Sequence, residues 1–190
     1  MMQNERKKGI MDKKYVIFID GGDTLVEEGS LNRDTEDVIS SANAVPGALE
    51  MLDELKESGY MICLIDDVRT QSVINVFTEN GHLDCFSSVS TSEETGVRKP
   101  APGIFEDAMR KNDLTEDDKK RIIMVGNSCR SDIAGANRFG ITSVLLDWSP
   151  RHSMTPQNAD EVPDFIIHEP GELPELLERL GNRGYEKVLG

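Results

Sequence analysis

The sequence predicts a single α/β domain in which helices cover both faces of a parallel sheet. Short apolar runs alternate with stretches of helical period, and this alternation is typical of βαβ units. The chain has 190 residues, of which 37% are hydrophobic and 29% are charged, a size and composition that suit one domain with a proper core. We therefore expect a three-layer arrangement of helices, sheet and helices.

Six short apolar runs supply the candidate strands. In chain order they cover residues 15–19, 60–65, 86–90, 121–125, 141–146 and 163–167. All of them are far shorter than the roughly 20 apolar residues that a membrane-spanning helix needs. Helical stretches separate them, so we expect parallel strands whose carboxyl ends share one edge of the sheet, where open α/β sheets bind ligands.

Four apolar stripes at helical spacing predict helices between these strands. The first helix uses Pro46 in its first turn, places Leu49, Leu52 and Leu55 on one side, and ends at Gly59. The other stripes are Val73, Ile74 and Phe77 before Gly81; Ile104, Phe105, Ala108 and Met109 after about Pro102; and Leu173, Leu176, Leu177 and Leu180 before Gly181. We assign all four stripes to the core.

Several segments lack such a period. Residues 1–13 are expected to form a flexible tail ahead of a domain that spans 14–190. The polar segment at about 26–45 follows the first strand and is expected to form a short flap, and 149–162 is another surface excursion.

Charge and cysteine content limit the partners. The chain has 21 Lys and Arg against 35 Asp and Glu, a formal net charge of −14, so we expect neither a nucleic-acid nor a membrane partner. Cys63, Cys85 and Cys129 are widely spaced and lack CxxC pairing, which indicates a reducing cytoplasm rather than a disulfide framework. The basic start is followed by too short an apolar run for a secretory signal, so a cytoplasmic location is expected.

Polar residues follow the first and fourth strands. Asp20 ends the first run and precedes Gly21 and Gly22, which let backbone approach a ligand closely. A carboxylate there can act as a nucleophile or cap the next turn. Asn127 ends the fourth run and Asp132 lies in the next helix, so with Asp20 and a backbone carbonyl they form a candidate Mg²⁺ site, although either alone also fits a helix cap.

Lys99 stands before a rigid proline, just ahead of a helix. A lysine near two carboxylates can neutralise a phosphoryl group and the nucleophile beside it, whereas alone it is more often a solvated charge. Together these stretches resemble the haloacid dehalogenase (HAD) superfamily across about residues 14–181. Its first motif, Asp-x-Asp-Gly-Thr-Leu, is similar to 20–25, its lysine motif to 98–100, and its fourth motif to 126–132 running on to 136 and 140.

The resemblance implies a Rossmann-like core and a Mg²⁺-dependent hydrolase of the phosphatase type. Such an enzyme acts on a small phosphorylated molecule through an aspartyl-phosphate, here on Asp20, with Lys99 as electrostatic clamp. The metal ligands would be Asp20, the Gly22 carbonyl, Asn127 and Asp132. The chain has no room for a large cap, so it resembles the capless branch (subclass III-like), whose open site admits a bulky substrate or is closed by a neighbouring subunit in a homo-oligomer.

The chain also departs from the family pattern. Gly22 stands where most phosphatases of the family have the Asp that protonates the leaving group and then activates water. Asp23, one position further on, is the candidate replacement in that catalytic role. General acid–base help is typically worth about 10²–10⁴-fold.

Asp66 follows the second strand, where the family has a phosphate-binding Ser or Thr. Either Asp66 is protonated, or it contacts a cation, or Arg69, Thr70 or helix amides hold the phosphate instead. Asp67 or Thr70 also fits a simple cap of the next helix. Asn127 replaces an Asp, which lowers the negative charge around the metal.

These departures leave alternatives to the phosphatase. A binding or regulatory protein would keep the metal and phosphate pocket without turnover. A metal-independent dehalogenase fits Asp132 and the Lys-Pro motif poorly.

Overall fold

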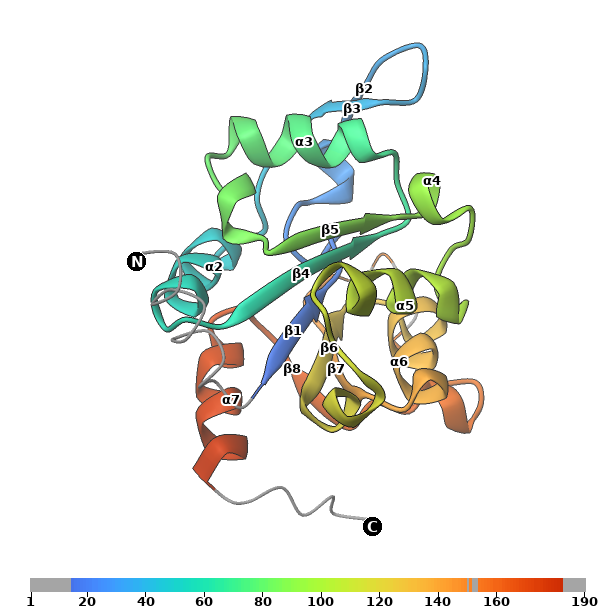
Figure 1. Cartoon of the computed structure of the whole chain (residues 1–190). Coiled ribbons are helices and arrows are strands. Elements are labelled where there is room, and N and C mark those ends of the chain that lie inside the picture. The colour runs from blue at the N-terminus through green and yellow to red at the C-terminus, as the bar shows by residue number, and fades with distance from the viewer. Residues whose placement is uncertain (1–14, 150, 152–153, 183–190) are drawn as a thin grey trace, which may run out of the picture.

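The computed structural model describes residues 15–149, 151 and 154–182, so the tail predicted for 1–13 lies outside the described residues. Its main sheet has six parallel strands in the order β5-β4-β1-β6-β7-β8 (Figure 1). Their bounds are β1 Val16–Ile19, β4 Met61–Asp66, β5 Ser88–Thr91, β6 Ile122–Gly126, β7 Thr142–Leu146 and β8 Phe165–Ile167. All six predicted strands are confirmed to within about two residues at either end.

The helices that join the strands also follow the predicted stripes. The α-helices are α2 Ala48–Glu57, α3 Thr70–Glu79, α4 Ser92–Thr95, α5 Pro102–Lys111, α6 Ala134–Phe139 and α7 Glu172–Asn182. Three details of the prediction were wrong. Pro46 precedes the first helix rather than starting it, Ile74 is 40% exposed rather than part of the core, and α7 runs through Gly181.

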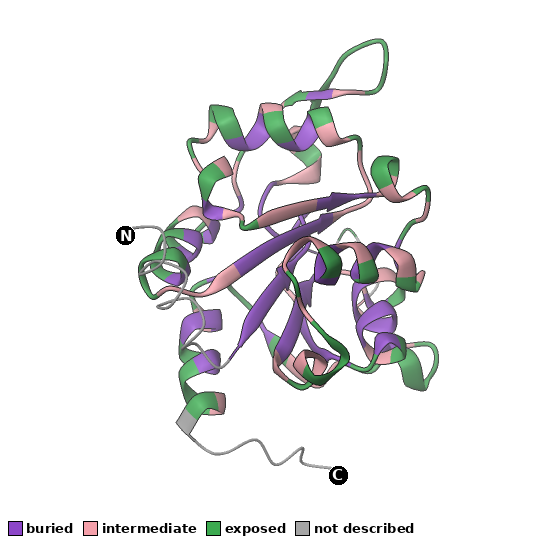
Figure 2. Cartoon of the chain, viewed as in Figure 1, coloured by how far each residue is buried: buried purple, intermediate pink, exposed green. Residues whose placement is uncertain are grey.

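Two apolar layers hold the sheet between the helices. Alternate side chains of each strand point to opposite faces, as the pleat of a strand requires. Ile17 and Ile19 pack with α2, α3 and α7, whereas Val16 and Phe18 pack with α5 and α6. Helices therefore cover both faces of the sheet, and the four central strands β4, β1, β6 and β7 are buried along most of their length (Figure 2). The expected three-layer α/β fold is confirmed.

The segment after β1 forms a small hairpin on the rim of the sheet. It contains the 3₁₀ turn η1 (Glu28–Ser30) and the antiparallel strands β2 (Asn32–Arg33) and β3 (Ile39–Ser41). The hairpin is fastened to α3, because the Ile39 N–H donates to Ser72 Oγ at 3.0 Å and Asn75 Nδ2 donates to the Ile39 carbonyl at 3.0 Å. It rises above α3 in Figure 1.

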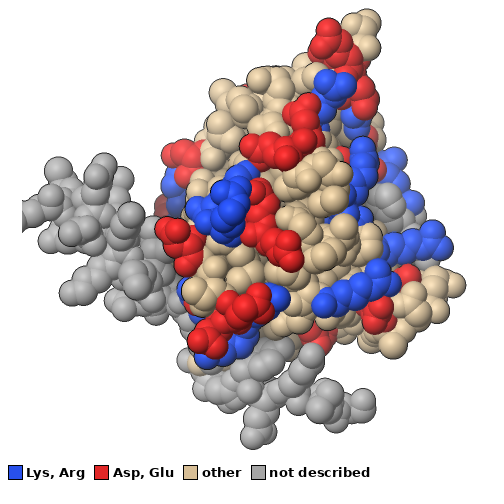
Figure 3. Space-filling model, turned by 45° about the vertical axis from the view of Figure 1, so that its right-hand side comes forward, with Lys and Arg blue, Asp and Glu red and all other residues tan. Residues whose placement is uncertain are grey.

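The strand order reverses direction at β1, which has β4 on one side and β6 on the other. In open parallel sheets, the crevice beyond the carboxyl ends at such a point is where ligands bind. On the face shown in Figure 3, acidic and basic side chains are interspersed rather than gathered by sign. Every helix in the described part of the chain is too short or too polar to cross a membrane.

Candidate functional site

One lysine joins the carboxyl ends of the central strands. The Lys99 ammonium donates hydrogen bonds to Asp20 Oδ1 and, at 3.0 Å, to the carbonyl of Ile65, the residue before the last of β4. It also lies 2.8 Å from Asp132 Oδ1, without hydrogen-bond geometry, so that contact is an ion pair. Asp20, Lys99 and Asp132 are only 6%, 7% and 1% exposed. Three of the predicted residues thus form one buried charge cluster.

Local backbone geometry sets the position of each group. The Asp20 N–H bonds to the Val125 carbonyl at 3.0 Å, which holds Asp20 between β1 and β6. Thr24 Oγ1 donates to Asp20 Oδ2 at 3.1 Å. Asp132 lies in η4 (Cys129–Ile133), a π-helical turn of the kind often found at functional sites, and its Oδ2 accepts the Ser128 N–H at 3.0 Å.

Burial and charge strongly perturb this cluster. Burial raises the pKa of Asp20 well above its ordinary value, and the nearby Asp132 carboxylate raises it further, while Lys99 opposes both. Burial alone would lower the pKa of Lys99, but the Asp132 and Asp20 carboxylates raise it well above its usual range. Lys99 therefore stays charged at neutral pH. One ammonium does not balance all the neighbouring carboxylates, so a further cation would be stabilised here.

The donor set fits a hard divalent cation. Asp20, Asn127 and Asp132 line one cavity together with Gly22. Asn127 Nδ2 is buried without a hydrogen-bond partner, and exchanging the amide nitrogen and oxygen would put an oxygen at that position. Within residues 15–149, 151 and 154–182, His, Cys, Asp and Glu side chains alone nowhere form a three-member metal cluster. A metal here would therefore need the Asn127 amide or a backbone carbonyl besides the two carboxylates.

The cavity at this edge of the sheet has a volume of about 300 Å³. The side chains and backbone around it come from the ends of β1, β4 and β6, from the hairpin and from the loop before α5. They are Asp20, Gly22, Val26, Glu28, Leu31, Arg33, Ile39, Asp66, Asp67, Val68, Arg98, Lys99, Asn127, Ser128, Ser131 and Asp132. Six of the predicted site residues are among them, and Asp23, Arg69 and Thr70 are not.

Asp23 does not take the catalytic place that the sequence suggested. It is fully buried, with a left-handed φ of 47°, and its carboxylate is committed elsewhere. Its Oδ1 accepts the Glu28 N–H at 2.8 Å, while Oδ2 accepts bonds from Ser149 Oγ at 3.2 Å and Arg151 Nε at 2.7 Å. The side chains of Asp20 and Asp23 therefore point in different directions. Asp23 joins the turn after β1 to the loop of Ser149 and Arg151.

Arg69 and Thr70 also miss the cavity beside Asp20. Thr70 Oγ1 shares a 2.7 Å hydrogen bond with Thr91 Oγ1, and the Thr70 N–H donates to Glu93 Oε2 at 3.0 Å. Arg69 lies 4.0 Å from Glu93 Oε1 and lines an adjoining groove of about 610 Å³. The expected phosphate-binding role of both side chains is therefore not supported by their positions.

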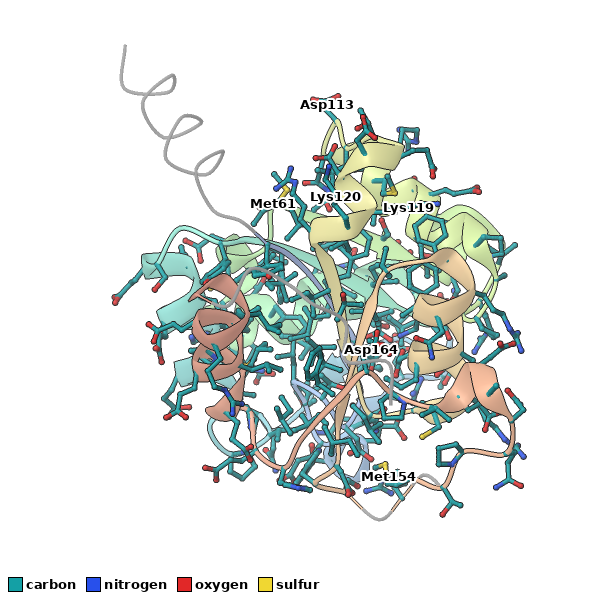
Figure 4. The ribbon with its side chains drawn as sticks, turned by 90° about the horizontal axis from the view of Figure 1, so that it is seen from below. Met61, Asp113, Lys119, Lys120, Met154 and Asp164 are labelled. Atoms are coloured by element: carbon teal, nitrogen blue, oxygen red, sulfur yellow. The ribbon has the colours of Figure 1, made fainter. Side chains whose placement is uncertain are left out.

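A second cavity, of about 380 Å³, lies at the opposite edge of the sheet. Its walls include Lys119 and Lys120 of η3 (Glu116–Arg121), just before β6, and Asp164, just before β8 (Figure 4). These are the amino ends of the strands, away from the Asp20 cluster. We therefore take the cavity at the carboxyl ends as the candidate active site.

Comparison with known proteins agrees with this geometry. The model of the haloacid dehalogenase-like hydrolase family matches residues 26–146, more than half of the chain. The chain belongs to the haloacid dehalogenase-like hydrolases. It is 32% identical over 135 residues to a glyceraldehyde 3-phosphate phosphatase of Methanopyrus kandleri, a match that covers 71% of this chain and 57% of that protein.

A second relative and a solved structure are also similar to the chain. It is 33% identical over 144 residues to a ribulose-1,5-bisphosphate 5-phosphatase of Halopiger xanaduensis, covering 73% of this chain and 59% of that protein. The chain thus spans less than two thirds of the length of these relatives. The crystal structure of a HAD phosphatase from Thermococcus onnurineus shares the fold, with a TM-score of 0.70 and 18% identity, over 86% of this chain and 97% of that one.

One departure from the HAD family pattern, at Asp66, is accommodated by a glycine. A Cβ on Gly21 would lie 2.1 Å from Asp66 Oδ2, so only glycine at 21 leaves room for this carboxylate. Burial raises the pKa of Asp66 to about 6, with Lys99 opposing the rise. Asp66 is therefore mostly ionised at pH 8, where it adds negative charge and would repel a phosphate that a Ser or Thr would bind.

We expect Asp66→Asn to stabilise the fold at pH 8. The folded-state pKa of about 6 exceeds the ordinary value of 3.8, so the stability that this group contributes is present below pH 3.8 and lost as the pH rises through 6. Asn has the same shape without the charge, and the expected gain in unfolding free energy is about 1–3 kcal/mol at pH 8. Urea unfolding at pH 8 and pH 4.5 checks this: a gain that is equal at both pH values would contradict it.

Six polar residues at the cavity were not among the predicted site residues: Glu28, Arg33, Asp67, Arg98, Ser128 and Ser131. Arg98 and Ser128 adjoin the predicted Lys99 and Asn127, so sequence proximity was a usable signal for them. Glu28 and Arg33 come from the hairpin, a polar segment with no hydrophobic period, and nothing in the sequence marks them out.

Proposed function

We propose that this chain is a Mg²⁺-dependent phosphomonoester hydrolase that transfers a phosphoryl group to Asp20. The observation that supports this most directly is the Lys99 ammonium, which contacts the Asp20 and Asp132 carboxylates at once. Such an arrangement holds a nucleophilic carboxylate still and brings positive charge to where the phosphoryl oxygens would gather. The alternative of a metal-independent dehalogenase fits less well, because without a metal only Lys99 would balance the Asp20 and Asp132 carboxylates.

The proposed roles follow from the contacts. Asp20 Oδ1 or Oδ2 attacks phosphorus, and Thr24 and Lys99 orient the carboxylate through their hydrogen bonds. Lys99 compensates the charge of the transferring group. Asp20, Asn127, Asp132 and the Gly22 carbonyl would hold Mg²⁺, which when bound neutralises phosphoryl oxygens and so lets an anionic substrate approach an acidic site.

The surroundings of the site support a small phosphorylated substrate. Arg33 and Arg98 are among the residues that line the cavity of about 300 Å³, and Arg can recognise phosphate or carboxylate by paired hydrogen bonds. The two relatives reported above are named for glyceraldehyde 3-phosphate and ribulose-1,5-bisphosphate, so we infer a phosphorylated sugar or a related metabolite. The hairpin at 26–45 would serve as the flap of a capless enzyme. The three free, buried cysteines support a reducing, cytoplasmic setting.

An assay with p-nitrophenyl phosphate tests the proposal. We expect turnover with millimolar Mg²⁺ and its loss after chelation with EDTA, restored when Mg²⁺ is returned. The good leaving group makes the assay tolerant of weak acid catalysis. Absence of Mg²⁺-dependent turnover, with calorimetry showing Mg²⁺-dependent binding of phosphate, would replace the proposal by a binding or regulatory protein.

A further inference from the structure

The side chain of Glu28 occupies the place that a side chain on residue 22 would need. A Cβ built on Gly22 would lie 2.7 Å from Glu28 Oε1, closer than real Cβ atoms approach, and 3.1 Å from Glu28 Cγ, which is a tight contact. Both residues line the cavity that contains Asp20. We propose that Glu28 is the general acid and base of the reaction, a carboxyl group supplied from the hairpin in place of the one that Gly22 lacks. This inference rests on the proposed function.

Glu28 is held in place by the same turn that carries Gly22. Its backbone N–H donates to Asp23 Oδ1 at 2.8 Å, and buried Asp23 is fixed in turn by Arg151 Nε at 2.7 Å. Arg151 Nε also lies 4.0 Å from Glu28 Oε2. The geometry of this turn thus depends on Asp23 as a positioning residue, and Glu28 itself begins the 3₁₀ turn η1.

The exposure of Glu28 suits proton exchange. Its side chain is 37% exposed, whereas the side chains of Asp20 and Asp132 are 9% and 1% exposed. A carboxyl group in that position reaches both the cavity and solvent, so it can be reloaded with a proton between turnovers. The buried cluster cannot supply this proton, because Lys99 ties up both carboxylates.

The proposed step has two halves. A carboxylate oxygen of Asp20 attacks phosphorus, the bond between phosphorus and the leaving oxygen breaks, and that oxygen takes the proton of the Glu28 carboxyl group. The Glu28 carboxylate then takes a proton from water, whose oxygen attacks phosphorus and breaks the bond to Asp20. Inorganic phosphate leaves, and both carboxyl groups return to their starting states.

The test compares an alkyl phosphate with an aryl phosphate. The value of kcat/KM reports the steps up to departure of the leaving group. An alkoxide must be protonated as it leaves, whereas p-nitrophenolate leaves without a proton. We expect Glu28→Gln to lower kcat/KM by about 10²–10⁴-fold for glycerol phosphate and by less than about 10-fold for p-nitrophenyl phosphate. We also expect a covalent phosphoenzyme to accumulate with the aryl substrate, because the base for the second half is gone.

A matched control and a relocated carboxyl group sharpen the test. Glu27→Gln removes the same charge one residue away, outside the cavity lining, and should leave the alkyl-to-aryl ratio unchanged. Gly22→Asp combined with Glu28→Ala moves the carboxyl group to residue 22 without the clash, and should raise alkyl turnover above that of Glu28→Ala alone. Thermal unfolding of each variant checks its fold.

The outcomes separate the two proposals. Active wild type with an unchanged alkyl-to-aryl ratio in Glu28→Gln overturns the role of Glu28 and leaves the proposed function standing. The role of Glu28 is also overturned if Gly22→Asp with Glu28→Ala hydrolyses the alkyl phosphate no faster than Glu28→Ala alone. Wild type that turns over neither substrate and forms no phosphoenzyme overturns the proposed function and this inference together.

Discussion

Replacing Asp20 by Asn is expected to lower hydrolysis of p-nitrophenyl phosphate by about 10⁴-fold or more, the scale of loss seen when a nucleophile is removed from an enzyme. An amide is nearly the same size as the carboxylate but does not form the covalent phosphoenzyme. Steady-state kcat and acid-quench trapping of the phosphoenzyme measure the loss. A variant that still forms the covalent intermediate would show that another residue is the nucleophile.

The fold of this variant should survive. Lys99 keeps its ion pair with Asp132 and its bond to the Ile65 carbonyl, and the substitution removes a buried charge from a carboxyl group whose pKa burial already raises. The matched control is Asp113→Asn. Asp113 is exposed, sits in a turn at the other edge of the sheet with a left-handed φ of 53° that Asn also tolerates, and should leave kcat unchanged (Figure 4).

Replacing Lys99 by Met is expected to cost about 3–5 kcal/mol of unfolding free energy at pH 8, because it leaves buried carboxylates without their cation. The stem of Met fills the same space, so the loss is electrostatic rather than a cavity. Turnover should fall along with stability, since in the proposed reaction Lys99 both orients Asp20 and compensates the charge of the transferring group. Urea unfolding and the p-nitrophenyl phosphate assay measure the two effects.

The pH dependence identifies the cause. Without Lys99, the pKa of Asp20 rises further, because burial and Asp132 then act unopposed. Because the pKa of Asp20 is higher in the folded state than in the unfolded state, Asp20 contributes stability at a pH below its unfolded pKa. That contribution is lost as the pH rises through the folded-state pKa. The deficit of Lys99→Met should therefore be smaller at pH 5 than at pH 8. The control Lys120→Met, at an exposed position, should lower the unfolding free energy by less than about 0.5 kcal/mol at either pH. If Lys99→Met lost the same unfolding free energy at both pH values, the cause would be packing and not charge.

The sequence was a good guide wherever a residue's place follows from a repeating pattern. Apolar runs of period two and stripes of period 3.6 located the strands and helices, because each pattern reports a face that must be buried. The same reasoning predicted that Asp20, Asn127 and Asp132 lie close together, since residues at the carboxyl ends of parallel strands meet at one edge, and the three line one cavity. Lys99 was singled out by the proline that follows it rather than by a repeating pattern. Ile74 shows the limit of the method, because the burial of a residue at the edge of an apolar stripe depends on which other segment packs against it.

Residues in turns and in the hairpin were beyond such reasoning. Asp23 was chosen for its nearness to Asp20 in sequence, but its left-handed backbone sends the carboxylate to Arg151, which lies far along the chain. Glu28 is positioned by the hydrogen bond of its N–H to Asp23 Oδ1, and the hairpin that carries Arg33 is fastened to α3 by Ser72 and Asn75. No local pattern encodes contacts of that kind.

By itself, the sequence determined the α/β architecture and the edge of the sheet at which Asp20, Asn127 and Asp132 lie, because those follow from periodicity and strand direction. Only the tertiary structure decided which carboxyl groups face that cavity. In the structure Asp23 points away from the cavity, Asp66 lies against Gly21, and Glu28 lies beside Gly22. The direction of a side chain in a turn depends on contacts with segments distant in the chain, and the sequence pattern does not report those contacts.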